Sequence, residues 1–144
     1  MDERAILLVE DNPDDEELTV AALRRNGVAN EIVVARDGVE ALDYLFGTGK
    51  WAGGGRPNRP QVVLLDLKLP RMGGFEVLRR MREDPVHETT PVVVLTSSSE
   101  DEDVVRSYKL GANSYVRKPV EFQLFNNAVR QLGLFWLLFN EAPR

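Results

Sequence analysis

The chain has 144 residues, 43% hydrophobic and 28% charged, a composition that fits one globular domain spanning residues 1–144. Its 18 basic and 23 acidic residues give a formal net charge of −5, so the basic surface of a nucleic-acid-binding protein is not expected. It has no cysteine, which excludes disulfides, zinc fingers, iron–sulfur clusters and thiol nucleophiles.

The sequence carries no recognisable signal for secretion or membrane insertion. The N-terminus has no basic segment followed by a long apolar run. The longest apolar run near the C-terminus, Leu134–Phe139, is far shorter than the roughly 20 residues of a membrane-spanning helix. We therefore expect a cytoplasmic protein with no membrane association.

The sequence alternates between predicted strands and predicted helices. Strands are predicted at 5–9, 32–35, 62–65, 92–95 and 114–116. A helix follows each strand: the first from Asp14 to Asn26, closed by Gly27, the second through Val39 and Phe46, and the third through Phe75 and Met81. The fourth runs through Val104 and Tyr108 and is closed by Gly111, and the fifth begins near Phe122. This order predicts an α/β fold: a flavodoxin-like, doubly wound parallel sheet with strand order 2-1-3-4-5 and helices on both faces.

Apolar patterns support these assignments. The runs 5–9, 62–65 and 92–95 are apolar throughout, which is typical of strands buried on both faces of a sheet. In the first helix, Leu18, Ala21, Ala22 and Arg25 recur at helical spacing, and the fourth helix is predicted from Val104, Val105 and Tyr108.

Residues 47–60 are rich in glycine and proline and are predicted to form a loop insertion. Loops of about 14 residues are usually functional or mobile. A glycine loop that binds phosphate follows a strand and precedes a helix, whereas this segment follows a predicted helix and precedes a strand. A phosphate-binding loop is therefore not expected here.

Polar residues stand where four of the predicted strands end: Glu10 and Asp11, Asp66, Thr96, and Lys118. Ligands of doubly wound sheets bind beyond the carboxyl ends of the strands. Each residue taken singly has an ordinary alternative, with Asp66 or Thr96 as a cap and Lys118 as a solvated side chain. Their occurrence at successive strand ends favours a shared site.

The segment after the first strand also reads as a helix start. Asn12 is suited to the N-cap, Pro13 to the first helical position, and Asp14 and Asp15 to the first turn. That structural role does not account for the two acidic residues that precede the cap.

Three carboxylates in one crevice repel one another unless a cation neutralises them. Oxygen ligands without His or Cys favour a hard ion such as Mg²⁺. A lysine and a hydroxyl beside a metal-bound carboxylate suit a phosphoryl group, because the cations balance its oxygens and the hydroxyl donates a hydrogen bond.

Together these positions resemble the receiver domain of two-component response regulators, and the resemblance covers nearly the whole chain. Residues 66–74 resemble the family's phosphoacceptor turn, with the expected Pro70 and glycines. Residues 111–112 and Tyr115, before Lys118, also fit the family's pattern.

The resemblance implies a role for each of these residues. Asp66 would accept a phosphoryl group from the histidine of a sensor kinase. Asp11, Asp66 and the backbone carbonyl of Lys68 would bind Mg²⁺, and Glu10 would act partly through water. Lys118 would pair with a phosphoryl oxygen.

The resemblance also implies a switch. Thr96 would hydrogen-bond a phosphoryl oxygen and shift when the group arrives, and Tyr115 would then change rotamer. The Lys118–Pro119 bond would be cis. Lys68 and Ser98 occupy positions that in the family influence how fast the phosphoryl group is hydrolysed. The resemblance further implies that the chain catalyses its own phosphorylation from phosphohistidine and its own slow dephosphorylation, without being a conventional enzyme.

Within the family, the insertion at 47–60 and the aromatic residues 135–137 resemble the small regulators that serve bacterial phytochromes, which implies a phytochrome-type sensor histidine kinase as partner. No output domain is expected, so the signal would pass through protein–protein contacts or a phosphoryl relay. Residues 133–144 are predicted to extend the last helix. Because every residue from Leu134 to Phe139 is apolar, we expect a homodimer through this helix, and the alternative is a tail folded onto its own domain.

Three other classes of function fit these residues less well. A flavin-binding electron carrier needs a hydroxyl- and glycine-rich loop after the first strand, where this chain is acidic. A phosphohydrolase with an Asp nucleophile often has a second Asp two residues on, where this chain has Lys68. A pseudo-receiver that acts as a dimeric binding module without phosphorylation stays open as the alternative.

Two further sets of residues are predicted to be solvated. His87 lies in a polar segment and is not expected to be a relay histidine. Arg71, Arg79, Arg80 and Arg82 are predicted to form a solvated face that could assist kinase docking.

Overall fold

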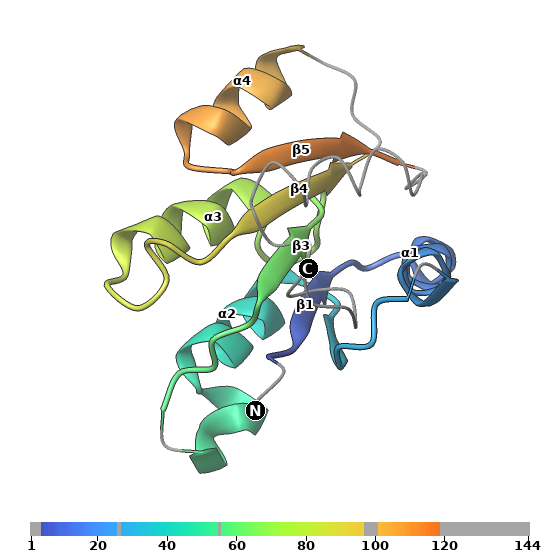
Figure 1. Ribbon diagram of the computed structural model, residues 1–144. Helices are drawn as coiled ribbons and strands as arrows, with labels where there is room; N and C mark the ends of the chain where they lie inside the picture. The colour runs from blue at the N-terminus through green and yellow to red at the C-terminus, as the bar shows by residue number, and fades with distance from the viewer. Residues whose placement is uncertain (1–3, 26, 55, 97–100, 119–144) are drawn as a thin grey trace, which may run out of the picture.

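The computed structural model describes residues 4–25, 27–54, 56–96 and 101–118, except for the side chains of Thr96 and Asp101. Five parallel strands form one sheet in the order β2-β1-β3-β4-β5 (Figure 1). The strands are β1 (Ile6–Val9), β2 (Ile32–Ala35), β3 (Val62–Leu65), β4 (Val92–Thr96) and β5 (Ser114–Arg117). The predicted flavodoxin-like topology is confirmed.

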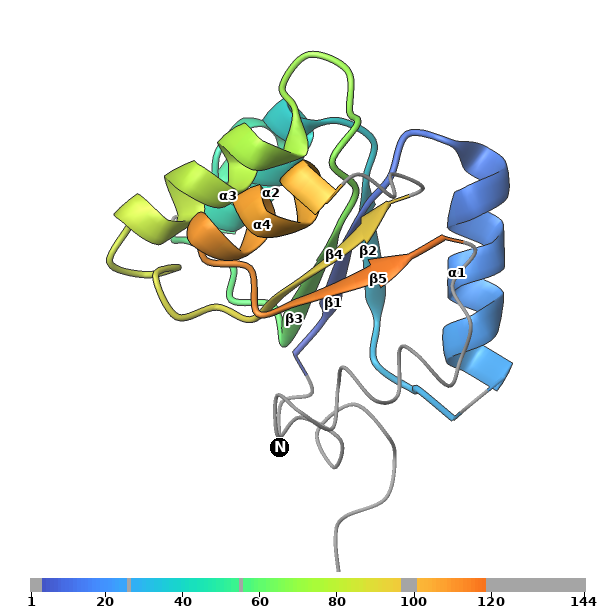
Figure 2. The same ribbon diagram turned by 90° about the horizontal axis from the view of Figure 1, so that it is seen from above.

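Four described α-helices flank the sheet: α1 (Pro13–Arg25), α2 (Gly38–Phe46), α3 (Gly74–Glu83) and α4 (Asp101–Lys109). Figure 2 shows α2, α3 and α4 on one face and α1 on the other. The described helices include none long and apolar enough to cross a membrane. A cytoplasmic location stays a prediction.

Two apolar clusters, one on each face of the sheet, explain why the strands lack alternation. Leu7 and Val9 point into the cluster formed with α2 and α3, whereas Ile6 and Leu8 point into the cluster that contains Leu23 of α1. Successive side chains of a strand face opposite sides. Because both sides are covered, every position of β1 is apolar and buried.

Helix α1 begins and ends as the sequence predicts, but it buries a different face. Asn12 caps it through Oδ1, which accepts the backbone N–H groups of Asp14 and Asp15 at 2.9 and 3.1 Å. Gly27, with φ +85°, follows its last turn. The buried residues are Thr19 and Leu23, while Leu18 is 59% exposed, so the apolar residues used to predict the helix do not mark its core side.

Helix α4 shows the same difference. Val105 and Tyr108 are 51% and 49% exposed, whereas Ser107 is buried and its hydroxyl donates to the carbonyl of Asp103 at 2.8 Å. Gly111, with φ +100°, follows the helix as predicted.

The insertion at 47–60 is not simply an irregular loop. It contains a 3₁₀ helix, η1 (Gly49–Gly54), which packs against α2. Trp51 meets Tyr44 edge to face, with ring centroids 5.3 Å apart, and the Lys50 ammonium lies 4.5 Å from the Trp51 ring. These aromatic contacts fasten a glycine-rich segment that the sequence pattern indicated only as a loop.

The prediction that His87 is solvated is wrong. Its ring is fully buried and its Nε2 lies 2.6 Å from the carbonyl oxygen of Leu45, which can only accept, so Nε2 carries the hydrogen. Its Nδ1 lies 3.0 Å from Thr90 Oγ1. The ring therefore joins the α3–β4 loop to the end of α2.

Arg82 also departs from the predicted solvated face. Its guanidinium donates to the carbonyls of Gly111, His87 and Thr90, at 2.9, 2.8 and 2.8 Å, and to Asn113 Oδ1 at 3.0 Å. Arg82 thus connects the end of α3 to two segments, the loop between α3 and β4 and the turn between α4 and β5. Arg79 and Arg80 are exposed and pair with Glu76, and Arg71 is exposed and pairs with Asp37.

Several predictions concern residues outside the described ranges. These are the last helix from Phe122, its extension over 133–144, the homodimer through it, and the cis bond before Pro119.

We expect His87→Gln to lower the free energy of unfolding at neutral pH by about 1–3 kcal/mol, because buried polar partners lose a hydrogen bond. Burial lowers the pKa of His87, so the folded chain favours the neutral ring. The stability contributed by the neutral ring is present above the unfolded pKa of about 6.5 and is lost as the pH falls below it.

Urea unfolding at several pH values from about pH 7.5 to about pH 5 tests this expectation. The wild type should lose more stability on acidification than His87→Gln. Glu88→Gln, at an exposed neighbour, serves as the control and should follow the wild type. Parallel pH dependence in wild type and His87→Gln would contradict the assignment.

Candidate functional site

The backbone ladder brings the first two acidic strand ends together. Glu10 follows β1 and its N–H donates to the carbonyl of Ala35 at 2.9 Å, while the N–H of Asp66 donates to the carbonyl of Val9 at 3.1 Å. Both carboxylate residues are buried, at 1% and 6% exposure. Parallel pairing therefore places them side by side at the carboxyl edge of the sheet.

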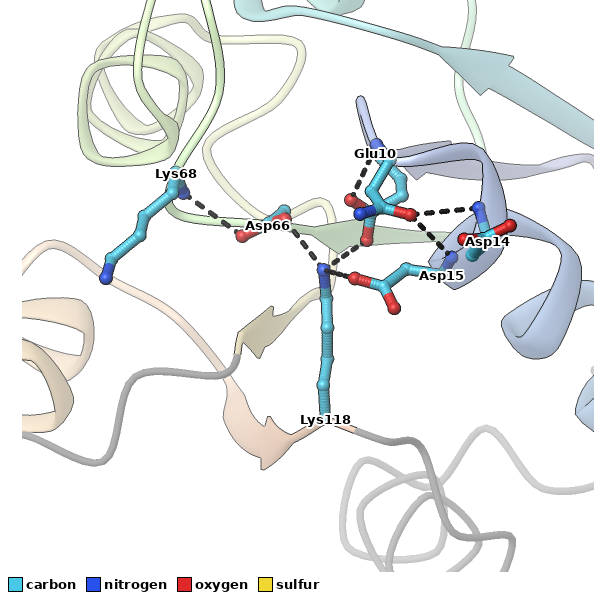
Figure 3. A network of polar contacts seen from close by, with 7 residues as sticks. Glu10, Asp14, Asp15, Asp66, Lys68 and Lys118 are labelled. Carbon is cyan, nitrogen blue, oxygen red and sulfur yellow. Dashed lines mark hydrogen bonds and ion pairs between the residues drawn. The ribbon is translucent and has the colours of Figure 1, made fainter.

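Lys118, from the end of β5, extends into this acidic edge (Figure 3). Its Nζ lies 2.8 Å from Asp66 Oδ2, 2.5 Å from Glu10 Oε1 and 3.0 Å from Asp15 Oδ2. The lysine side chain is only 9% exposed. The ammonium is thus the described counter-charge of three carboxylates, which come from the end of β1, the first turn of α1 and the end of β3.

The charges of this cluster depend on one another. Burial raises the pKa of Glu10 to about 7; the hydrogen bond from Lys118 opposes that rise and the charge of Asp66 adds to it. Burial opposes the charge on Lys118, yet its bonds to Asp66, Glu10 and Asp15 hold the lysine pKa above its usual value. The site therefore holds an ionised lysine beside buried carboxylates, whose negative charge is stabilised by a neighbouring positive charge.

The acidic residues also fit a metal ion. One carboxylate oxygen each from Glu10, Asp11 and Asp66 lies within 4.8 Å of the others. The donors are all oxygen, which suits a hard cation such as Mg²⁺. Glu10 and Asp66 are buried and Asp11 is exposed, so solvent reaches one side of the cluster.

Lys68 contributes through its backbone. Its N–H donates to Asp66 Oδ1 at 3.1 Å, while its side chain is exposed and its ammonium points away from Asp66 and Lys118 (Figure 3). The role of its carbonyl as a metal ligand stays a prediction.

The turn after Asp66 is held by close backbone contacts. A Cβ on Gly74 would lie 2.4 Å from the carbonyl oxygen of Asp66, and one on Gly38 would lie 2.2 Å from that of Met72. Arg71, with φ +61°, donates through Nε to Asp37 Oδ2 at 2.8 Å, and Asp37 caps α2. These contacts fasten the turn to the starts of α3 and α2.

The two predicted switch residues lie in β4 and β5. Thr96 ends β4 opposite Arg117, and the predicted contact of its hydroxyl lies outside the described side chains. Tyr115 is half-buried and packs against the apolar cluster under α2 and α3. Their movement on phosphorylation stays a prediction.

Asp15 joins the site although the sequence indicated only a first-turn acid. As the third residue after the N-cap Asn12, it faces Lys118 from the first turn of α1. Because α1 starts directly after the acidic end of β1, its first turn lies close to that strand end. The short spacing between Glu10 and Asp15 in the sequence could therefore have indicated that Asp15 belongs to the site.

The family is shown by comparison with known proteins. The family model for the response regulator receiver domain matches residues 6–130. The chain belongs to this family. It is 42% identical over 138 residues to the regulatory protein FilR2 of Methanothrix harundinacea, and this match covers 96% of this chain and 86% of FilR2. It is 37% identical over 134 residues to response regulator Rcp1 of Synechocystis sp., and this match covers 93% of this chain and 89% of Rcp1.

Solved structures of response regulators are also similar to this chain. The bacteriophytochrome response regulator AtBRR is 55% identical with a TM-score of 0.86, and the match covers 98% of this chain and 100% of AtBRR. The phosphorylated cyanobacterial phytochrome response regulator RcpA is 40% identical, with a TM-score of 0.77 and 94% and 95% coverage. The Mn²⁺-bound form of Rcp1 is 35% identical, with a TM-score of 0.76 and 98% and 99% coverage.

We expect Gly74→Ala to destabilise the chain by about 1–3 kcal/mol, because the added Cβ would overlap the backbone of Asp66 and Leu67. Gly73→Ala is the matched control, since its Cβ would meet only the Leu67 carbonyl at 3.7 Å. Thermal unfolding of both variants measures the difference. Equal effects at the two glycines would contradict the close approach at Gly74.

We expect Lys118→Met, measured without divalent cations, to lower the free energy of unfolding by about 3–5 kcal/mol, because buried carboxylates lose their counter-charge. Mg²⁺ should recover part of this loss. Lys68→Met is the control and should change stability by less than about 0.5 kcal/mol, since that side chain is exposed. Urea unfolding in EDTA and in Mg²⁺ is the measurement. Equal stability of the two variants in EDTA would contradict the role of Lys118.

Proposed function

We propose that this chain acts as a stand-alone response regulator that accepts a phosphoryl group from a sensor histidine kinase onto Asp66 in the presence of Mg²⁺. The observation that carries the proposal is the burial of Asp66 between an acidic cluster and the Lys118 ammonium, 2.8 Å away. A carboxylate so placed has a cation beside it to balance the oxygens of a phosphoryl group.

The chemistry assigned to the residues is a single displacement. A carboxylate oxygen of Asp66 attacks the phosphorus of a phosphohistidine, the P–N bond breaks, and its electron pair leaves with the imidazole nitrogen. Lys118 would hold a phosphoryl oxygen through its ammonium. Mg²⁺, held by Glu10, Asp11 and Asp66, would neutralise the charge that the carboxylates and the phosphoryl oxygens bring together.

The relatives support both parts of this proposal. The similar Rcp1 is known in a Mn²⁺-bound form, which supports a divalent cation at the acidic cluster. The similar RcpA is known in a phosphorylated form, which supports phosphoryl transfer. Since AtBRR and RcpA are phytochrome response regulators, we propose a phytochrome-type kinase as the partner.

The proposed output follows the sequence predictions. Thr96 and Tyr115 would respond to the phosphoryl group, and a homodimer through the last helix would present the response to other proteins. A cytoplasmic location is part of the same proposal. Slow self-dephosphorylation would return the chain to its resting state.

Incubation with Mg²⁺ and acetyl phosphate, followed by intact mass spectrometry, tests the proposed acceptor. The wild type should gain one phosphoryl group, and Asp66→Asn should gain none while keeping its fold by circular dichroism. Asp14→Asn, at an exposed aspartate nearby, is the matched control and should be labelled like the wild type.

Two outcomes would oppose the proposal. A label retained by folded Asp66→Asn would place the acceptor elsewhere. No label on any folded protein, with acetyl phosphate or with a beryllofluoride mimic, would favour the pseudo-receiver alternative.

A further inference from the structure

A small pocket lies at the opposite edge of the sheet from Asp66. It has a volume of about 250 Å³ and is lined by residues that precede β1, β3 and β4, among them Arg4, Gln61 and Pro91. Asp66 follows the last residue of β3, whereas Gln61 precedes its first residue, so the length of β3 separates the two places. The proposed phosphoryl acceptor does not use this pocket.

Two arginines line this pocket, Arg4 and Arg59. Neither guanidinium forms an ion pair with a carboxylate of the described residues, although the exposed Arg36, Arg71 and Arg79 all do. The lining of the pocket contains no acidic residue. Two guanidinium groups without an ion pair among the described residues, at one small pocket of a chain with net charge −5, form a local attraction for anions.

Gln61 is the independent observation that points to a ligand. It is 9% exposed, and its backbone N–H donates to the carbonyl of Ala5 at 2.7 Å. Its side-chain carboxamide forms no hydrogen bond within the described part of the chain. Buried polar groups are nearly always hydrogen-bonded, so a buried carboxamide without a partner is unusual.

Gln61 is one of the residues that line the pocket. Beside it the loop between α3 and β4 supplies Val86 and Thr89 to the lining. The buried carboxamide therefore belongs to a residue of the pocket wall.

The chemistry of the lining selects the ligand. Guanidinium groups, the carboxamide N–H₂ and the hydroxyl of Thr89 are donors suited to oxygen atoms that carry negative charge. Thr90 also lines the pocket, but its hydroxyl is paired with His87. The volume is below the range of about 300–1,000 Å³ that holds larger ligands. We propose that this pocket is a binding site for a small oxyanion, a phosphate or a short carboxylate, held by Arg4, Arg59 and Gln61.

Titrations of the ¹⁵N-labelled full chain, one with inorganic phosphate and one with succinate, test this proposal and distinguish the two oxyanions. At least one anion should cause saturable shifts of the Gln61 side-chain N–H₂ and of the Thr89 amide. The double variant Arg4→Ala/Arg59→Ala should weaken that binding by at least about tenfold, because charge-assisted hydrogen bonds are lost.

Arg56→Ala is the matched control, since Arg56 is an exposed arginine of the same segment that does not line the pocket. It should leave the affinity within about twofold of the wild type. Three results would overturn the proposal: no saturable shift with either anion, equal weakening by Arg56→Ala and by the double variant, or shifts confined to the residues around Asp66. The last result would leave the proposed phosphoryl acceptor intact, so the two proposals fail separately.

Discussion

The interaction on which the site depends is the Lys118 ammonium among buried carboxylates. Glu10 and Asp66 are almost fully removed from water, and two adjacent negative charges without compensation would not stay ionised there. Lys118 reaches Asp66 across 52 residues of sequence and therefore ties the end of β5 to the ends of β1 and β3. A cation held by the same carboxylates would compensate the same charge, so lysine and metal ion are partly interchangeable supports for one acidic edge.

Backbone geometry, more than side-chain packing, sets where Asp66 stands. The ladder bond from its N–H to Val9 fixes its start, and the N–H of Lys68 holds Oδ1 in place. The turn that follows is confined by Gly74, where no Cβ fits against the Asp66 carbonyl. A carboxylate whose oxygens are already oriented loses little further freedom when it reacts, which is the advantage of a preorganised site.

The strands and the edge at which their polar residues gather could be predicted, because both follow from local patterns in the sequence. Continuous apolar runs indicated strands covered on both faces, and the strand order then placed Glu10, Asp66 and Lys118 at one edge. The burial of His87 could not be predicted, because it depends on a contact between the α3–β4 loop and Leu45 of α2. Such a contact between distant segments leaves no periodic pattern in the sequence. Leu18 was misleading since a receiver helix can expose a leucine while burying Thr19.

The two edges of the sheet differ because all five strands run in one direction. The carboxyl ends of β1, β3 and β5 meet at the acidic cluster through Glu10, Asp66 and Lys118. At the other edge, residues that precede β1, β3 and β4 line the pocket that contains Arg4, Arg59 and Gln61. The exposed arginines are weak evidence for a ligand, since solvated arginines are common on protein surfaces. A buried carboxamide that has no hydrogen-bond partner in the described part of the chain is stronger evidence, because removing it from water costs free energy that an acceptor would offset. The anion site therefore depends chiefly on Gln61, and the arginines supply the charge that brings an acceptor to it.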